Sequence, residues 1–513
     1  MPPRESFDLL VVGGGINGCA IARDAAGRGL SVLLCEQGDL AQGTSSRSSK
    51  LIHGGLRYLE QFQFRLVREA LAERELLLRN APHAVRPLRF VLPHDASRRP
   101  AWMIRLGLLL YDALGARKRL PRSRAIDLRR DEAGAPLKPG FAKGFAYADC
   151  RADDSRLVLL NALGAAERGA SIRPRTRFTA ARHHAGRWVA ELRPAPAGAA
   201  GEPPQPYEVE AGVLVNAAGP WLDRVMQSAL GLTAYRHLRL VQGSHLVFPR
   251  LYEGEHAYIL QHTDGRVVFA IPFLHRFTLV GTTDVPFSGD PAQARIAPEE
   301  AAYLCEAVNR YFQRPIAPEE AVWSYSGVRP LAEDRAASAS RVSRDYVLEL
   351  EVDEGAAPLL AVIGGKLTAH RELAEKALEK LAPYLPDRGK PWTAEAPLPG
   401  GEVPGADLEA WGADFRARHP WLPEEPARRL AALYGARAER VVGGAASLAD
   451  LGRHFGAGLY EREAEYLVQV EWARSAEDIL WRRTKLGLDF TAAEARQLQD
   501  WLDGRHTAQE GRA

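Results

Sequence analysis

The N-terminal residues change their hydrophobic period twice within thirty positions. Phe7–Val12 is a short, mostly apolar run, which is typical of a parallel strand covered on both faces. Residues 17–29 then place apolar side chains at helical spacing, and one side of that helix would carry Ile16, Ala20, Ile21 and Ala25. Ser31–Cys35 is a second short apolar run. The pattern predicts a strand, a helix and a second strand in succession.

The turn after the first strand has the spacing GxGxxG, formed by Gly13, Gly15 and Gly18. The first glycine allows a tight turn, the second lets a pyrophosphate approach the backbone, and the third lets helix and strand pack closely. The helix N-terminus offers N–H groups and a partial positive charge to a diphosphate. Glu36 ends the second strand, where a carboxylate can accept ribose hydroxyls. This combination predicts a dinucleotide site, and a purely structural glycine turn is the alternative.

The segment Thr44–Glu60, TSSRSSKLIHGGLRYLE, favours a flavin over a nicotinamide. It is too polar for a buried strand and too rich in glycine for a helix. A plain NAD fold would place another crossover helix here. Hydroxyls and backbone N–H groups of a loop can instead wrap a diphosphate or an isoalloxazine ring, and Gly54 and Gly55 allow close approach to a flat ring.

Composition excludes several classes of protein. The 513 residues carry a net charge of only +3, so the chain as a whole does not indicate a nucleic-acid partner. The four cysteines are scattered and form no CxxC pair, which predicts reduced, buried thiols and no metal site. There is no apolar run of about 18 residues, so no membrane-spanning helix is predicted. Beyond the proline- and glycine-rich stretch 385–405 the spacing turns helical, with Ser475 as an expected N-cap.

Long motifs resemble the FAD-dependent, aerobic-type glycerol-3-phosphate dehydrogenases, within the superfamily of D-amino-acid and glycine oxidases. The resemblance spans residues 7–487 and rests on GGGINGCAIARDAAGRGLSVLLCE, TSSRSSKLIHGGLRYLE, NAAGPW, QGSHLVF, YSGVRPL, GGKLTAHRELAEKALEKL and EWARSAEDILWRRTKLGL. The departures are Cys19, where the family usually has alanine, and Ala369 with His370, where it usually has Thr-Tyr.

The resemblance implies an α/β fold in which a Rossmann-type FAD domain is interleaved with a mixed-sheet substrate domain, followed by an all-helical C-terminal domain. The expected FAD domain covers about 1–75, 150–235 and 346–385, the substrate domain about 76–149 and 236–345, the linker 386–405 and the C-terminal domain 406–513. The C-terminal domain would support the body or mediate self-association as a homodimer, and the sequence does not choose between them.

The activity implied is oxidation of sn-glycerol 3-phosphate to dihydroxyacetone phosphate by hydride transfer to FAD, with electrons passed on to a membrane quinone. A dianionic phosphate calls for guanidinium and ammonium groups. In the family motifs these are Arg57, Arg329, Arg344 and Lys366, and Tyr58 would bond the substrate or pack on the flavin.

A base must take the hydroxyl proton, and His245 and His53 are the candidates, with Lys366 polarising the substrate oxygen. The alternative for each histidine is a hydrogen-bonded residue of the core. The Gly364–Thr368 turn precedes a helix and can aim N–H dipoles at the flavin. The expected cofactor-binding residues are Gly13, Gly14, Gly15, Asn17, Gly18, Glu36, Thr44, Ser45, Ser48, Ser49, Gly54, Gly55, Ala218, Gly219, Gly365, Lys366, Leu367 and Thr368.

Residues 98–124 carry eight basic residues and one acid, Asp112. One helical face would carry Trp102, Met103, Leu106, Leu109, Leu110 and Leu114. A basic amphipathic helix with tryptophan and leucine is typical of a segment lying in a membrane interface, and a core helix with a basic edge is the alternative. We therefore expect a cytoplasmic protein bound peripherally to the inner face of the cell membrane through anionic lipid.

Other functions remain open at this point. A glycerol-phosphate oxidase that uses dioxygen would share the flavin and phosphate sites. An amine or amino-acid oxidase of the superfamily would want one carboxylate-binding arginine rather than a cluster of cations. A catalytically idle FAD-binding scaffold is disfavoured by Arg57, Arg329 and Lys366, and a nicotinamide enzyme by the single GxGxxG.

Overall fold

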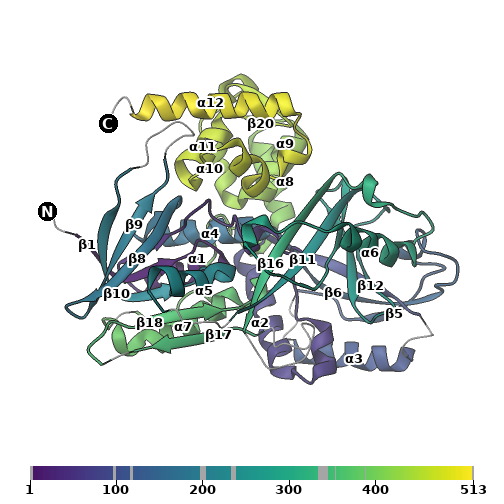
Figure 1. Cartoon of the computed structure of the whole chain (residues 1–513). Coiled ribbons are helices and arrows are strands. Elements are labelled where there is room, and N and C mark those ends of the chain that lie inside the picture. Colours follow the sequence, from purple (N-terminus) through teal and green to yellow (C-terminus); the bar gives the residue numbers. More distant parts are fainter. Residues whose placement is uncertain are drawn as a thin grey trace.

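The computed structural model describes residues 4–95, 100–115, 119–196, 204–232, 238–332, 345–352, 354–387 and 389–510, without the side chains of Arg57 and of residues 506–510. The chain forms three parts, which we call the first, second and C-terminal domains. Figure 1 shows the first two side by side, with the C-terminal domain lying across their junction and helix α3 on the opposite side of the molecule.

The first domain is built on an eight-stranded sheet in the order β17-β18-β10-β1-β2-β7, to which β8 and β9 add beside β10. β18, β10, β1, β2 and β7 run parallel to their neighbours, whereas β17, β8 and β9 pair antiparallel. The central strands are covered on both faces, so they read as continuous apolar runs. The strands are β1 (Glu5–Val12), β2 (Val32–Cys35), β7 (Ser171–Arg173), β8 (Thr176–His184), β9 (Arg187–Pro194), β10 (Tyr207–Asn216), β17 (Val347–Glu351) and β18 (Leu359–Ile363).

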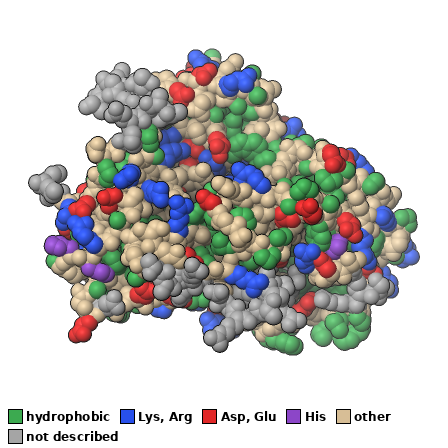
Figure 2. All heavy atoms as spheres, viewed as in Figure 1, with side chains coloured by type: hydrophobic (Ala, Val, Ile, Leu, Met, Phe, Trp, Pro, Cys, Tyr) green, Lys and Arg blue, Asp and Glu red, His purple; other side chains and the backbone are tan. Residues whose placement is uncertain are grey.

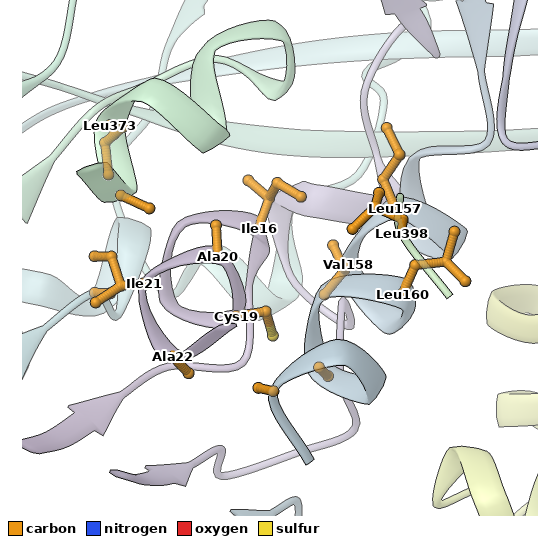
Figure 3. Close-up of a cluster of buried hydrophobic side chains, with 14 of the residues drawn as sticks. Ile16, Cys19, Ala20, Ile21, Ala22, Leu157, Val158, Leu160, Leu373 and Leu398 are labelled. Carbon is orange, nitrogen blue, oxygen red and sulfur yellow. The ribbon is translucent and has the colours of Figure 1, made fainter. Parts of the chain in front are cut away.

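Three helices pack on one face of this sheet: α1 (Ile16–Gly27), α4 (Asp154–Ala166) and α7 (His370–Leu381). Figure 3 shows Cys19 and Ala20 of α1 between Val158 of α4 and Leu373 of α7. Small side chains at the centre of α1 let both flanking helices approach closely, which explains why all but two of its residues are buried. Past β10 the chain continues through α5 (Leu222–Arg224) and a π-helical turn, Val225–Ala229.

The second domain has a ten-stranded sheet in the order β15-β11-β14-β13-β12-β4-β6-β3, with β16 beside β11 and β5 beside β6. Helix α6 (Pro298–Asn309) packs on one face of this sheet, and α2 (Phe64–Asn80) and α3 (Ala101–Leu114) pack together on the other face. The strands are β3 (Leu51–Ile52), β4 (Val85–Pro93), β5 (Arg124–Asp127), β6 (Lys143–Ala152), β11 (Leu238–Pro249), β12 (Ala257–Gln261), β13 (Val267–Phe273), β14 (Phe277–Gly281), β15 (Val285–Pro286) and β16 (Trp323–Ala332).

The C-terminal domain has its own hydrophobic core, which includes Phe415, Tyr434, Leu467 and Leu498. It is helical apart from a short hairpin, β19 (His454–Gly456) with β20 (Leu459–Tyr460), which the sequence analysis did not anticipate. Its helices are α8 (Leu408–Arg418), α9 (Glu424–Tyr434), α10 (Ala438–Val442), α11 (Glu461–Glu471) and α12 (Ala492–Glu510). The interleaved α/β body and helical C-terminal domain agree with the expected fold class.

The junction between the body and the C-terminal domain buries His83, which lies in the turn before β4. Only 3% of His83 is exposed, and neither ring nitrogen has a hydrogen-bond partner among the described residues. A Cβ atom placed on Gly435, at the end of α9, would lie 2.9 Å from Cγ of His83, so the ring touches the C-terminal domain directly. Burial, followed by the charges of Arg156, Arg86 and Arg437, lowers the pKa of His83 to about 3.

We predict that this junction makes the fold sensitive to acid. Below pH 6.5 the unfolded chain protonates His83 and the folded chain does not, so stability falls as the pH drops towards 3. The loss approaches a few kcal/mol, at about 1.4 kcal/mol per unit difference in pKa. His83→Leu removes the titrating group at similar volume. Urea midpoints measured at pH 7 and pH 4.5 should differ less for this variant than for the wild type, and an equal difference would exclude His83 as a cause.

Candidate functional site

A cavity of about 560 Å³ opens at the carboxyl ends of β1, β2 and β10. Its volume is within the range of sites for small molecules and cofactors. The end of a parallel sheet is where such sites are expected in α/β folds. The lining includes ten of the predicted cofactor residues, namely Gly13, Gly14, Gly15, Asn17, Glu36, Thr44, Ser45, Ala218, Gly219 and Gly365.

The glycine turn is packed so tightly that larger residues would not fit. A Cβ atom on Gly13, whose φ is +115°, would lie 2.5 Å from the carbonyl oxygen of Ala217 at the end of β10. A Cβ atom on Gly18 would lie 2.0 Å from the carbonyl oxygen of Gly13. Gly15 caps α1 without any side-chain hydrogen bond, so the positive end of the helix faces the cavity.

Glu36 closes the turn from the side of β2. Its carboxylate accepts hydrogen bonds from the backbone N–H of Gly14 at 2.7 Å and of Gly38 at 2.8 Å. Burial raises the pKa of Glu36, and these two N–H groups oppose that rise. A carboxylate has about four lone-pair sites, so Glu36 keeps acceptor capacity for hydroxyls of a ligand.

Several residues of the cavity were not anticipated from the sequence. They include Gln42, Arg224 and the start of β8, Thr176–Thr179. β8 reaches the cavity because the backbone N–H of Thr176 donates to the carbonyl oxygen of Glu36 at 2.7 Å. This contact joins segments 140 positions apart, and no local motif accompanies it, so the sequence offered no signal for it.

A second group of predicted residues meets beside the cavity, where the turn after β18 meets the turn after β3. The ammonium of Lys366 lies 4.0 Å from the ring centroid of Tyr58. The backbone N–H of His53 donates to the hydroxyl of Thr368 at 3.3 Å. Gly364 and Gly365 have φ of +75° and +99°, which suits glycine, and the side-chain amide of Asn17 donates to Gly364 O at 3.0 Å.

His245 and Arg329 lie on one face of the paired strands β11 and β16. His245 is opposite Tyr325 in the register and stacks on its ring at 4.8 Å between centroids. Its Nε2 lies 2.9 Å from the hydroxyl of Ser49, and its Nδ1 has no partner among the described residues. Arg329 pairs with Asp284. Burial, then the charges of Arg329 and Lys50, lower the pKa of His245 well below 6.5, so its imidazole is neutral at working pH.

The other predicted residues of this region have protein partners. Ser48 donates its hydroxyl hydrogen to Asp154 at 2.8 Å, and the backbone N–H of Gly54 donates to the hydroxyl of Tyr111 at 2.9 Å. Gly55 has the positive φ of a left-handed turn, and Leu367 begins a short 3-10 helix. The side chain of Arg57 and the whole of Arg344 lie outside the described residues.

His370, which stands where the family usually has tyrosine, has a structural role. His370 is 1% exposed, its Nδ1 lies 2.7 Å from the carbonyl oxygen of Leu367 and its Nε2 lies 3.3 Å from the amide of Asn161 on α4. Burial lowers its pKa to about 4, so it is neutral near pH 7 and Nδ1 can donate to Leu367. It therefore ties the turn that carries Lys366 to helix α4.

Comparison with known proteins identifies the family. The family model described as FAD dependent oxidoreductase matches residues 8–371, and the C-terminal domain of alpha-glycerophosphate oxidase matches residues 391–501. A glycerol-3-phosphate dehydrogenase of Pseudomonas aeruginosa is 53% identical over 505 residues, covering 98% of this chain and 96% of its own. The chain belongs to the FAD-dependent glycerol-3-phosphate dehydrogenase family.

One further relative and one crystal structure are also similar to this chain. A D-erythritol 1-phosphate dehydrogenase of Brucella abortus is 50% identical over 503 residues, covering 98% of this chain and 99% of its own. The crystal structure of the glycerol-3-phosphate dehydrogenase of Bacillus halodurans in complex with FAD superimposes with a TM-score of 0.71 at 25% identity, covering 98% of this chain and 94% of that one. FAD is therefore the cofactor, and the interleaved fold predicted from the sequence is confirmed.

The cavity fits such a cofactor on its own geometry. Gly13 and Gly18 leave no room for a Cβ atom, so the turn is shaped to bring backbone N–H groups up to a ligand. Oδ1 of Asn17 is buried without a partner among the described residues, although it lines the cavity. The residues present would hold the diphosphate at the start of α1 and the ribose near Glu36.

We predict that His245→Ala lowers turnover by about 10²-fold or more while FAD stays bound, because a neutral imidazole with an available Nδ1 can accept the hydroxyl proton. Turnover and the visible flavin spectrum are measured on the same preparation. His53→Ala is the matched comparison. Near-normal turnover in His245→Ala, with the loss appearing in His53→Ala, would transfer the role of base to His53.

Proposed function

We propose that the protein oxidises the secondary alcohol of a polyol phosphate, sn-glycerol 3-phosphate, to dihydroxyacetone phosphate and passes the electrons to a membrane quinone. The observation that carries the proposal is the position of two cations beside the cavity. Pro330 and Gly365 line the cavity, and Arg329 and Lys366 are their immediate neighbours in sequence. These neighbours belong to different strand ends, those of β16 and β18.

The two strand ends are in contact. A Cβ atom on Gly364 would lie 3.4 Å from the carbonyl oxygen of Pro330. Tyr58, under the ammonium of Lys366, brings the 3-10 helix Leu56–Gln61 and the backbone of Arg57 to the same place. A guanidinium and an ammonium group from two separate segments suit a dianionic phosphate, whereas a carboxylate substrate needs only one cation. The cluster therefore favours a phosphate ester over an amino acid.

When bound, FAD supplies the acceptor for the hydride from carbon-2 of the substrate. The protein has to hold the phosphate, orient the carbon and remove the hydroxyl proton. In our proposal Arg57, Arg329, Arg344 and Lys366 hold the phosphate, and His245 or His53 takes the proton. The Gly364–Gly365 turn lines the cavity and can present backbone N–H dipoles, which favour negative charge on the cofactor.

The length of the polyol is a separate question, because the Brucella abortus relative is named for a four-carbon phosphate. Glycerol 3-phosphate and D-erythritol 1-phosphate share a hydroxyl on the carbon next to the phosphate-bearing carbon. A cradle for the phosphate serves both compounds, so the longer polyol phosphate is the second candidate substrate.

The proposed route to quinone passes through α3. Its apolar face is exposed to solvent, with Trp102 at 65%, Met103 at 46%, Leu106 at 59%, Leu109 at 47% and Leu110 at 39%. Phe62 at 79% and Phe64 at 37%, from the neighbouring segment, extend this surface. We call these seven side chains the apolar face. Figure 2 shows hydrophobic side chains gathered at the lower edge of the molecule, where α3 lies in Figure 1.

A helix that served only as part of the core would bury this stripe, whereas only Leu108 and Tyr111 of α3 are fully buried. No helix among the described residues is long and apolar enough to cross a bilayer. The basic residues around α3 in the sequence suit anionic headgroups. A bilayer surface is therefore the occupant that we propose for the apolar face, on the inner side of the cell membrane.

The apolar face is mechanically joined to the predicted flavin segment. Tyr111 of α3 accepts the N–H of Gly54 at 2.9 Å and donates its hydroxyl hydrogen to Asp149 at 2.7 Å. Asp149 in turn pairs with Arg74 of α2 at 2.6 Å, and all three side chains are buried. Phe62 follows Tyr58 closely in the chain and is among the most exposed side chains of the apolar face. A quinone held at this surface would thus lie next to the turn that carries His53–Tyr58.

The first test of this function follows the flavin absorbance of the detergent-purified holoenzyme without oxygen. Addition of sn-glycerol 3-phosphate should bleach the oxidised band, and a short-chain quinone should restore it. D-Erythritol 1-phosphate and glycine are added in parallel. Faster bleaching by D-erythritol 1-phosphate would identify that compound as the substrate. Bleaching by glycine alone would contradict the proposed phosphate-binding role of the cations. Recovery with dioxygen but not with quinone would show an oxidase.

We predict that Leu106→Glu with Leu109→Glu lowers co-sedimentation with phosphatidylglycerol vesicles by about tenfold or more, because burying a carboxylate in the interface is costly. The matched control is Val322→Glu with Val352→Glu, two exposed apolar residues, at 52% and 42%, outside the apolar face. All variants should retain FAD. Equal vesicle binding by both double variants would contradict a membrane role for α3.

A further inference from the structure

The loop after β2 reaches from the cavity to the C-terminal domain. Gly38, Ala41, Gln42 and Gly43 line the cavity, and we call residues 37–43 the cofactor loop. Its inner side is fixed to the first domain, since the N–H of Ala41 donates to Gly14 O at 3.0 Å. Its outer side carries Asp39, whose side chain points away from the cavity lining and is 2% exposed.

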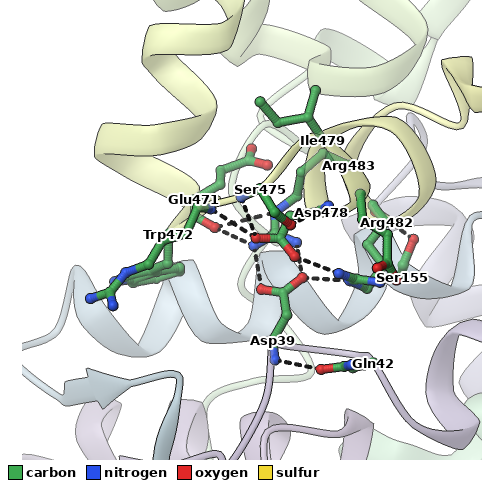
Figure 4. A network of polar contacts seen from close by, with 12 residues as sticks. Asp39, Gln42, Ser155, Glu471, Trp472, Ser475, Asp478, Ile479, Arg482 and Arg483 are labelled. Carbon is green, nitrogen blue, oxygen red and sulfur yellow. Dashed lines mark hydrogen bonds and ion pairs between the residues drawn. The ribbon is translucent and has the colours of Figure 1, made fainter. Parts of the chain in front are cut away.

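The carboxylate of Asp39 is held by two arginines of the C-terminal domain (Figure 4). Arg482 Nε donates to Oδ2 at 2.6 Å, and Arg483 donates to Oδ2 at 2.6 Å and to Oδ1 at 2.9 Å. Arg482 and Arg483 are 7% and 0% exposed, so these are charge-assisted bonds with little solvent screening. Arg483 also donates to the carbonyl oxygen of Glu471, which fixes it within its own domain.

A second carboxylate, Asp478, balances the guanidinium charges. It pairs with Arg482 and with Arg175 from the turn before β8. The backbone N–H of Arg175 donates to Gly38 O at 2.8 Å, so this arginine is itself attached to the cofactor loop. Asp478 and Ser475 cap each other across the start of residues 476–483, with Asp478 N donating to the Ser475 hydroxyl at 3.2 Å. The C-terminal segment is therefore locally rigid where it meets the loop.

The same C-terminal segment also contacts the residues that support the other side of the cavity. Lys485 donates to Asp153 at 2.8 Å and to Ser155 at 2.6 Å, at the start of α4. The residue between them, Asp154, binds Lys50 at 2.9 Å and accepts the hydroxyl hydrogen of Ser48. Ser48 and Lys50 directly follow Thr44, Ser45 and Arg47, which line the cavity. Residues 482–485 thus hold both loops that border the cavity, one directly and one through α4.

We propose that the C-terminal domain is part of the cofactor site, and that Arg482 and Arg483 act through Asp39 to position the cofactor loop for FAD. Asp39 is a positioning residue, because its carboxylate is turned towards the C-terminal domain while its neighbours face the cavity. Loss of one guanidinium would leave the buried carboxylate of Asp39 with only one of its two arginine partners. The loop would then relieve that cost by turning Asp39 to solvent, which displaces Gly38 and Gln42 from the lining. The inference depends on FAD as cofactor and not on the substrate or the electron acceptor.

The test measures FAD affinity in the full-length holoenzyme rather than activity. Free and bound flavin are separated by ultrafiltration over a dilution series, and unfolding is followed by circular dichroism. Arg482→Gln and Asp39→Asn should each raise the dissociation constant of FAD by at least about tenfold. Arg482→Lys keeps the charge and can still reach Asp39, so it should show a smaller rise.

Arg437→Gln is the matched control. Arg437 pairs with Glu167 at the end of α4, which also joins the C-terminal domain to the first domain, but neither residue lines the cavity. This variant should lower the unfolding temperature and leave FAD affinity within about twofold. An equal rise of the dissociation constant in Arg437→Gln would show that any loosening of the C-terminal domain weakens FAD binding. That result would contradict a specific role for Asp39. Unchanged affinity in folded Asp39→Asn or Arg482→Gln protein would overturn the proposal.

Discussion

The close approach of the glycine turn to the ends of β1 and β10 is the constraint on which the site depends. Gly18 packs directly on the carbonyl of Gly13, and Gly13 packs on Ala217, with no space for a side chain at either contact. This packing fixes the direction of α1 and so aims its N-terminus at the cavity. The small side chains of α1 serve the same end, because they let α4 and α7 settle against it.

Around this rigid turn, the loops that shape the site are held by buried charges. Asp39, Asp149 and Asp154 are each 2% exposed or less, and each pairs with a cation from another segment. A buried pair of this kind is weak evidence for stability, because desolvation offsets the attraction. The pair acts instead on the conformation of the loop. Because leaving the carboxylate unpaired is costly, the loop is held in the position in which the pair forms.

The sequence carried enough information for the parts of the site whose causes are local. The turn Gly13–Gly18, Glu36 and the hydroxyl-rich segment could be placed because spacing and residue type alone require that geometry. The exposed face of α3 also followed from helical spacing, and its exposure in the structure favours the membrane interpretation over the core one. The start of β8 and the role of Asp39 could not be predicted. The bond from Arg483 to Asp39 spans 444 positions, and pairings at that distance depend on the complete fold.

These long-range pairings divide the support of the site among all three domains. Tyr111 of α3 holds the Gly54 turn from the side of the apolar face, whereas Arg482 and Arg483 hold the cofactor loop from the opposite side of the molecule. β16 closes the space between them, with Val328 O accepting the hydroxyl hydrogen of Thr44 at 2.6 Å. A displacement of α3 on a bilayer would reach the flavin segment through the hydroxyl of Tyr111 and through the packing of α3 on the 3-10 helix Leu56–Gln61. The cofactor loop, anchored to the C-terminal domain, would keep its place. The two supports of the site, Tyr111 on one side and the arginines of the C-terminal domain on the other, therefore belong to different domains.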